Sequence, residues 1–211
     1  MNDALGSIDA NQLDIFREIG SIGSGNATTA LASLLNRKIG MSIPDVQIVQ
    51  FNDIINILNG PESLVVGILV NMSGNLNGYI LMILEAKDAF DMLSMMLGSE
   101  DELPVARVLS DMSEMELSAL TEMANILVGA YLSAICSLTN LSVQPSVPQV
   151  AIDMVGAIIS IVAIEYSQIG DSVRFLKTQF WDVDKEIAGH FFLIPDFESY
   201  KVLMKSLGIE M

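Results

Sequence analysis

The chain has 211 residues, of which 51% are hydrophobic and 17% are charged. This balance excludes disordered and fibrous proteins, and the length allows a sizeable core. A net charge of −16, from ten Lys and Arg against 26 Asp and Glu, disfavours nucleic acid and anionic membranes as partners. The single Cys136 and single His190 exclude a disulfide framework and a Cys/His zinc site.

The mean hydropathy of +0.50 makes membrane insertion worth testing. The densest apolar stretches, Ile126–Leu138 and Met154–Ile164, are 13 and 11 residues long by subtraction, whereas a spanning helix needs about 20. Residues 1–9 lack the basic region and apolar run of a secretory signal. We therefore expect a cytoplasmic protein that does not enter a membrane.

The first half of the chain predicts a long helix followed by strands. Apolar residues recur at helical spacing from about Gln12 to Asn36. The segment Ser42-Ile43-Pro44 then ends the pattern, because a residue before proline disfavours the helical conformation. Three extended segments and a short helix ending at Leu97-Gly98 follow. The extended segments are Asp45–Phe51, Ser63–Asn71 and Gly78–Glu85.

The second half repeats this order. An acidic, turn-rich connection at 98–104 and an amphipathic linking helix at 105–112 are predicted before it. A long helix is predicted over Glu114–Thr139, and a short helix ends at Leu207-Gly208. The extended segments predicted between them are Gln149–Met154, Ala157–Tyr166, Val173–Phe180 and His190–Ile194.

The two halves are also similar in sequence. A shift of 104 residues aligns Leu13–Val46 with Leu117–Val150 without a gap and gives eleven identities, where chance would give about two. The identical pairs are Leu13/Leu117, Glu18/Glu122, Ile22/Ile126, Gly25/Gly129, Ala30/Ala134, Ser33/Ser137, Leu34/Leu138, Asn36/Asn140, Ser42/Ser146, Pro44/Pro148 and Val46/Val150.

The repeat predicts the fold class. We expect one domain, residues 1–211, made of repeats at about 12–98 and 114–208 that are joined by the linker and helix at 99–113. The class is α/β in its α+β form, in which a pseudo-twofold axis relates two helix-plus-β-sheet units and the long helices lie outside the sheet.

Each long helix carries one polar stripe. Positions i, i+4 and i+7 fall within about 60° around a helix axis. The stripe of the second helix consists of Ser118, Glu122 and Asn125, and that of the first consists of Asp14, Glu18 and Ser21. A solvated face explains one such stripe, but its duplication among apolar positions favours a retained surface role.

These residues resemble the motif of the CheC/CheX/FliY phosphatases, which act on the phosphorylated chemotaxis response regulator CheY. The motif is Asp or Ser, three residues, Glu, two residues, Asn, twenty-two residues and Pro. The second copy is complete as Ser118, Glu122, Asn125 and Pro148. The first copy, with Ser in place of Asn, is Asp14, Glu18, Ser21 and Pro44. Residues 17–27 and 148–154 also resemble the family's CheC branch.

The resemblance implies a division of labour. Hydrolysis of an aspartyl phosphate proceeds by in-line attack of water, and the catalyst mostly positions groups and stabilises charge. Asn125 would orient the water, and Glu122 would pair with a lysine beside the phosphate. CheY would bring both the phosphoaspartate and Mg²⁺, so no cofactor or metal site is expected on this chain.

The first copy is expected to be weak or silent. The hydroxyl of Ser21 would stop about 1–2 Å short of a carboxamide's reach, and a misplacement of that size can cost on the order of 10²-fold. Glu18 would still contact the partner.

The resemblance also implies a second partner, the receptor deamidase CheD, which binds and stimulates the phosphatase. Asp153 follows a stretch from Met123 to Ile152 without charged residues, and it is the candidate for that surface. One alternative remains: a non-catalytic CheD-binding adaptor that senses phosphorylated CheY. Asn125 is essential for turnover in the enzyme and dispensable in the adaptor. A monomer is expected.

The first helix contains a glycine-rich stretch formed by Gly20, Gly23 and Gly25. It lacks the Lys-Ser/Thr of a P-loop and lies within a helical pattern, so a nucleotide site is disfavoured. Close packing of the helix on the sheet through residues without side chains is the predicted explanation, and Gly129 at the repeated position supports it.

Overall fold

The computed structural model describes residues 10–36, 38–41, 45–98, 107–166, 172–181 and 186–209. Both halves contain a helix, two strands, a helix, two strands and a helix. The first half consists of α1 (Ala10–Leu35), β1 (Gly40–Met41), β2 (Asp45–Gln50), α2 (Phe51–Ile57), β3 (Leu64–Gly74), β4 (Gly78–Glu85) and α3 (Ala86–Leu97). The second consists of α4 (Glu114–Thr139), β5 (Val143–Pro145), β6 (Gln149–Met154), α5 (Val155–Tyr166), β7 (Ser172–Trp181), β8 (Glu186–Pro195) and α6 (Phe197–Ser206).

The eight strands form one antiparallel sheet. Its order is β1-β7-β8-β4-β3-β5, while β2 also pairs with β7 and β6 with β3. The edge strands of each half therefore pair with the other half. At the centre, Met82 of β4 lies opposite Phe191 of β8 and Ile83 lies opposite His190. The strands β7 and β8 occupy in the second half the place that β3 and β4 occupy in the first, and β7 begins 108 residues after β3. Exchanging these two pairs gives the same arrangement read from the opposite edge of the sheet, as expected for a pseudo-twofold axis between β4 and β8.

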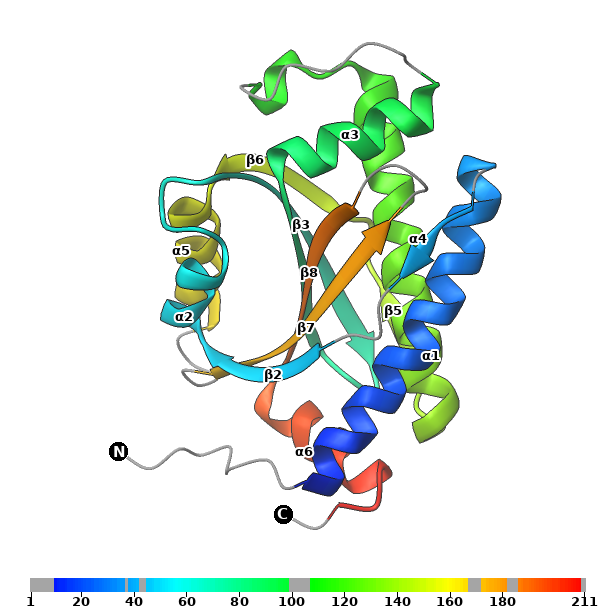
Figure 1. The fold of residues 1–211 in the computed structure, drawn as a ribbon. Coiled ribbons are helices and arrows are strands. Elements are labelled where there is room, and N and C mark those ends of the chain that lie inside the picture. The colour runs from blue at the N-terminus through cyan, green and yellow to red at the C-terminus, as the bar shows by residue number, and fades with distance from the viewer. Residues whose placement is uncertain are drawn as a thin grey trace.

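Helices cover both faces of the sheet. In Figure 1, α1 and α4 lie on one side with α3 and α6 at its ends, while α2 and α5 lie on the other. The larger core cluster joins α1, α3, α4 and α6 to the sheet, and a second cluster lies between the sheet and the pair α2 and α5. The predicted fold class, with long helices outside a sheet, is confirmed. The proposed repeat boundaries stay a prediction.

The helix α4 is long and apolar enough to cross a membrane by length and composition. However, 56% of its most apolar window is buried inside the protein. Its buried side chains belong to the larger core cluster, so α4 has the packing of a core helix.

The strand predicted at Ala157–Tyr166 is wrong, because this segment lies in α5. Its β-branched composition favours a strand. Its buried residues nevertheless recur at helical spacing and pack on the second face of the sheet; they are Val155, Ile158, Ile159 and Val162. Gly67 of β3 permits this approach, since a Cβ there would lie 2.6 Å from Cδ1 of Ile158.

The linking helix predicted at 105–112 is also wrong where the structure describes it. Arg107 and Val108 are not helical, and only a 3₁₀ turn, η1 (Leu109–Asp111), follows. The helix α2 at Phe51–Ile57 was not predicted, since its first residue was assigned to the preceding strand. The remaining predicted strands and helices are confirmed to within a few residues where described.

The side chain of Arg107 connects the linker to the start of α4. Its Nη1 and Nη2 donate hydrogen bonds to the Glu116 carboxylate at 2.6 and 3.0 Å, and its guanidinium lies 5.6 Å from the ring centroid of Phe90 on α3. Glu116 also accepts hydrogen bonds from the main-chain nitrogen and hydroxyl of Ser113, which completes a capping box. The hydrogen bond from Arg107, followed by those from Ser113, lowers the pKa of Glu116 to about 2.

We expect Arg107→Ala to lower the free energy of unfolding by about 3 kcal/mol at pH 7, because it leaves a buried carboxylate without its cation. Glu116 has a lowered pKa in the folded state, so its contribution is complete above its ordinary pKa of 4.5 and is lost as the pH falls toward 2. The difference between the two proteins should therefore shrink between pH 7 and pH 3 in urea unfolding.

The matched control is Arg17→Ala, which breaks an exposed ion pair with Asp14. Exposed pairs contribute little, so this change should cost less than about 1 kcal/mol. Equal losses of unfolding free energy in the two variants would show that the buried contact of Arg107 contributes no more than an exposed ion pair.

Candidate functional site

The polar stripe predicted on α4 lies at the surface. The side chains of Ser118, Glu122 and Asn125 are exposed, whereas Leu120, Met123, Ala124 and Leu127 on the same helix are buried against the core. Glu122 and Asn125 are separated by three positions, which brings their Cβ atoms to about 5–6 Å. The structure thus groups all three predicted α4 residues on one accessible face.

The functional groups on this face are available to a partner. Among the described residues, neither Glu122 nor Asn125 is hydrogen-bonded or ion-paired through its side chain. The α4 sequence contains no Lys or Arg, and the nearby Arg107 is bound to Glu116. A carboxylate and a carboxamide on a helix that itself carries no Lys or Arg suit a partner that carries positive charge.

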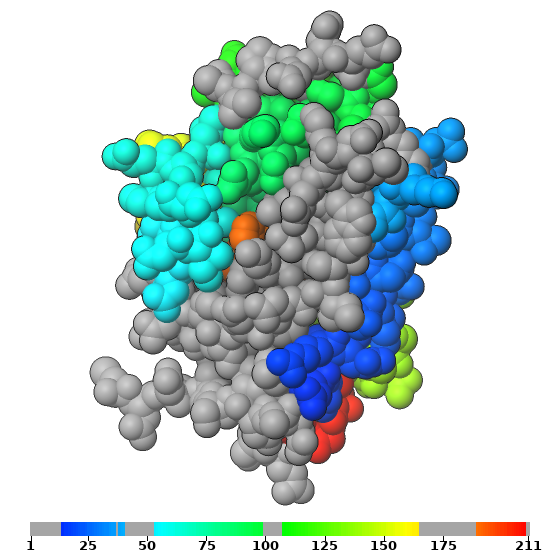
Figure 2. All heavy atoms as spheres, in the orientation of Figure 1, coloured from blue at the N-terminus to red at the C-terminus, as the bar shows by residue number. Residues whose placement is uncertain are grey.

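The equivalent stripe on α1 is also exposed but differs chemically. Figure 2 shows the outer side of α1, in blue, at the surface, and Asp14, Glu18 and Ser21 are exposed. Nη1 of Arg17 lies 3.0 Å from Oδ1 of Asp14. The residue of α4 equivalent to Arg17 is Thr121, whose hydroxyl donates to its own helix. The first stripe therefore contains an ion pair between Asp14 and Arg17 and has no carboxamide.

The two stripes lie at opposite ends of a helix pair. Figure 1 shows α1 and α4 side by side and antiparallel, and each stripe occupies the first half of its helix. The α4 stripe is near α3 and the Arg107–Glu116 contact, whereas the α1 stripe is near α6. The two sites could each meet a separate partner molecule.

The motif proline of the second copy interrupts an edge of the sheet. Pro148 is buried and lies between β5 and β6, which both pair with β3. Ser146 keeps this break attached to β3, because its nitrogen donates to the Asn71 carbonyl and its hydroxyl accepts from the Asn71 nitrogen. Pro148 therefore has a structural position, and Pro44 lies outside the described residues.

The Asp153 candidate is not part of either stripe. It is exposed near the end of the edge strand β6, opposite Val65 of β3, and its Oδ1 accepts from the Met154 nitrogen at 2.7 Å. The adjacent α5 also exposes two large apolar side chains, Ile161 at 60% and Ile164 at 76%. The end of β6 and this side of α5 are both accessible to solvent.

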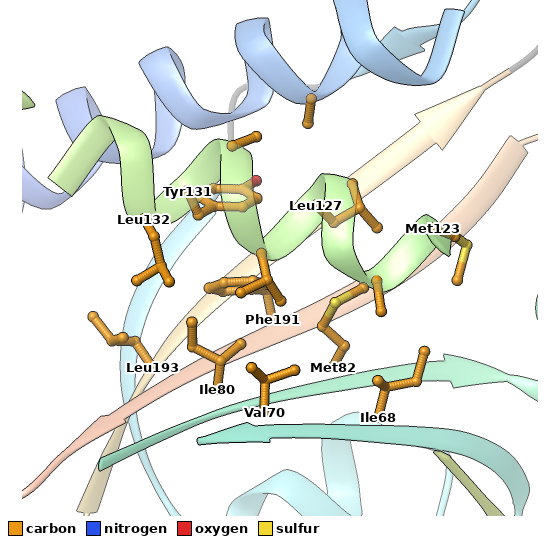
Figure 3. Close-up of a cluster of buried hydrophobic side chains, with 14 of the residues drawn as sticks. Ile68, Val70, Ile80, Met82, Met123, Leu127, Tyr131, Leu132, Phe191 and Leu193 are labelled. Atoms are coloured by element: carbon orange, nitrogen blue, oxygen red, sulfur yellow. The ribbon is translucent and has the colours of Figure 1, made fainter. Parts of the chain in front are cut away.

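The glycines of α1 and α4 have different roles. Tyr131 is 1% exposed and lies between α1 and the sheet, with its ring centroid 4.4 Å from that of Phe191 (Figure 3). A Cβ at Gly23 would approach Cδ1 of Tyr131 to 2.5 Å. The close contact is therefore between the two helices.

The predicted packing of glycines on the sheet is wrong for Gly25 and Gly129. Both are exposed, and a Cβ on either one would have no neighbour within 4 Å. The sequence alone could not distinguish these two exposed glycines from the closely packed Gly23, because the difference depends on where the Tyr131 ring lies.

Metal ligands do not gather in the part of the chain that the structure describes: no group of three or more His, Cys, Asp or Glu side chains there could hold an ion.

Comparisons with known proteins identify relatives of this arrangement. A family model described as "Chemotaxis phosphatase CheX" matches residues 66–160, and one described as "CheC-like family" matches residues 12–48. The chain is 36% identical over 208 residues to "CheY-P phosphatase CheC" of Bacillus subtilis (strain 168), covering 97% of each protein.

Solved structures show the same fold. The crystal structure of Thermotoga maritima FliY matches with a TM-score of 0.76 and 17% identity, over 96% of this chain and 98% of that one. A CheX chain from the CheX-CheY-BeF3-Mg+2 complex of Borrelia burgdorferi matches with a TM-score of 0.51 and 18% identity, over 83% and 97%.

We expect Gly23→Ala to destabilise the protein by about 1–3 kcal/mol, because the added methyl group would overlap the Tyr131 ring. Gly25→Ala, two residues away, should instead stabilise it by about 0.5–1 kcal/mol through the helix preference of alanine. Thermal and urea unfolding of the two variants measure this contrast. A stable Gly23→Ala protein would contradict the close helix contact.

Proposed function

The chain belongs to the CheC-like family, and we propose that it is a phosphatase that hydrolyses the aspartyl phosphate of CheY at the α4 stripe. The observation that carries the proposal is the exposed, unengaged pair of Glu122 and Asn125 one helical turn apart. The relatedness to "CheY-P phosphatase CheC" over nearly the whole chain supports the substrate.

In the proposed reaction, water attacks the phosphorus in line, and the bond from phosphorus to the aspartyl oxygen breaks to release inorganic phosphate. Asn125 accepts a hydrogen bond from the water and fixes its direction of attack. Glu122 pairs with a lysine beside the phosphoaspartate and sets the register of the two proteins. The complex of a CheX protein with CheY, BeF3 and Mg²⁺ supports the view that the metal arrives with CheY.

Site one, formed by Glu18 and Ser21 on α1, contributes little turnover in this proposal. Ser21 has a shorter side chain than Asn125, so its hydroxyl would not reach the position of the attacking water. In addition, Asp14 of this stripe is already paired with Arg17 of the same helix.

Phosphate loss from purified phosphorylated CheY in the presence of Mg²⁺ tests the proposal. We expect the wild-type chain to accelerate the loss, Asn125→Ala to reduce the acceleration by about 10²-fold, and Ser21→Asn to increase it. The matched control is Asn26→Ala, which removes an exposed asparagine of α1 outside the stripe and should keep its activity within about twofold.

An Asn125→Ala variant with more than half of the wild-type rate would contradict the proposed role of this residue. If the wild-type chain binds CheY or CheD but does not accelerate phosphate loss, the phosphatase hypothesis is wrong and the adaptor hypothesis takes its place.

A CheD-binding surface at the end of β6 is the second part of the proposal. Asp153 and the 48% exposed Met154 place a charge beside an apolar side chain, a combination that suits protein recognition. The same surface would serve CheD in the enzyme and in the adaptor.

Pull-down with CheD measures the contribution of Asp153. We expect Asp153→Lys to abolish binding while the unfolding temperature stays unchanged, because the side chain is exposed. Glu198→Lys in α6 makes the same change of charge at an exposed position away from this surface and should bind normally. Unaltered CheD binding by Asp153→Lys would remove Asp153 from the interface.

A further inference from the structure

Two exposed glycines occupy equivalent places on the long helices. Gly25 is residue 16 of the 26 in α1, and Gly129 is residue 16 of the 26 in α4. A glycine inside a helix is less favourable than alanine. At both positions a Cβ would meet nothing within 4 Å, so the described fold gives no steric reason to exclude alanine.

The position of Gly129 relative to the α4 stripe is specific. It follows Asn125 by four residues and Glu122 by seven, and this spacing places it within the same sector of about 60°. Gly25 has the same relation to Ser21 and Glu18. The glycine thus adjoins the proposed water-orienting position in each half.

The contact with the Tyr131 ring inside the protein explains why position 23 is a glycine. No such contact explains Gly129, whose surroundings are open. The open space at Gly129 lies on the face that carries Glu122 and Asn125, where the backbone of α4 is accessible to a partner.

We propose that Gly129 is a positioning residue at which the surface of phosphorylated CheY comes into contact with the backbone of α4. This inference rests on the proposed phosphatase function. Asn125 has a short side chain, so its carboxamide reaches a water beside the phosphorus only if the helix itself comes close to the partner. A side chain at position 129 would stand between the two surfaces one turn beyond Asn125 and hold the carboxamide away.

The test compares Gly129→Ala and Gly129→Leu with wild type and Asn125→Ala in the phosphate-loss assay, with kcat and KM measured separately. Gly129→Ala should raise the unfolding temperature by about 2 °C while lowering kcat about threefold or more. Gly129→Leu should lower kcat/KM by about 10²-fold, the loss expected for a misplacement near 1 Å. A purely structural role would not combine higher stability with lower turnover.

Ser137→Leu is the matched control, because it adds the same bulk at an exposed position two turns further along α4. It should keep kcat/KM within about twofold of wild type, as expected for a surface residue outside the contact. A loss equal to that of Gly129→Leu would overturn the inference, since added bulk anywhere on the helix would then have the same effect.

The outcomes separate this inference from the function on which it rests. If wild type is active, Asn125→Ala is inactive and Gly129→Leu stays within twofold of wild type, the inference falls and the phosphatase stands. If wild type does not accelerate phosphate loss, the proposed function falls and the inference falls with it.

Discussion

The contact between Gly23 and the ring of Tyr131 sets how closely α1 and α4 approach each other. The ring occupies the space that a side chain at position 23 would need, and it also packs against Phe191 of the central strand β8. Because Gly23 has no side chain, the Tyr131 ring can contact both α1 and the sheet, and the two long helices and the sheet form one continuous core. With their inner sides buried in this way, the outer sides of both helices are left exposed to a partner.

The two halves use one scaffold for two different surfaces. Their long helices have equal lengths and begin 104 residues apart, yet Asn125 corresponds to Ser21 and Thr121 corresponds to Arg17. These differences lie on exposed faces, where a substitution changes chemistry at little cost to packing. The α4 face carries a carboxamide at the position where the α1 face carries a hydroxyl, so the two faces offer a partner different hydrogen-bonding groups.

The long helices and the strands near Gln149–Met154 and Gly78–Glu85 could be predicted because proline, glycine and periodicity mark their limits. The α5 segment could not, because the periodicity of a short apolar run does not distinguish a strand from a buried helix, and its β-branched residues favour a strand. The 3₁₀ turn Leu109–Asp111 was predicted as part of a helix, because the sequence alone does not show that Arg107 bonds to the Glu116 carboxylate. The grouping of Glu122 with Asn125 followed from helical spacing, but the separate roles of Gly23 and Gly129 required the position of the Tyr131 ring.

Two glutamates of α4 show how position determines role. Glu116 and Glu122 are six residues apart, which turns them about 120° from each other around the helix. Glu116 is buried and satisfied by Arg107 and Ser113, and these hydrogen bonds lower its pKa to about 2 and hold it as a fixed anion. Glu122 is exposed on the stripe with Asn125, where its charge has no such internal partner among the described residues. The first carboxylate fixes the start of the helix, and the second remains exposed at the surface.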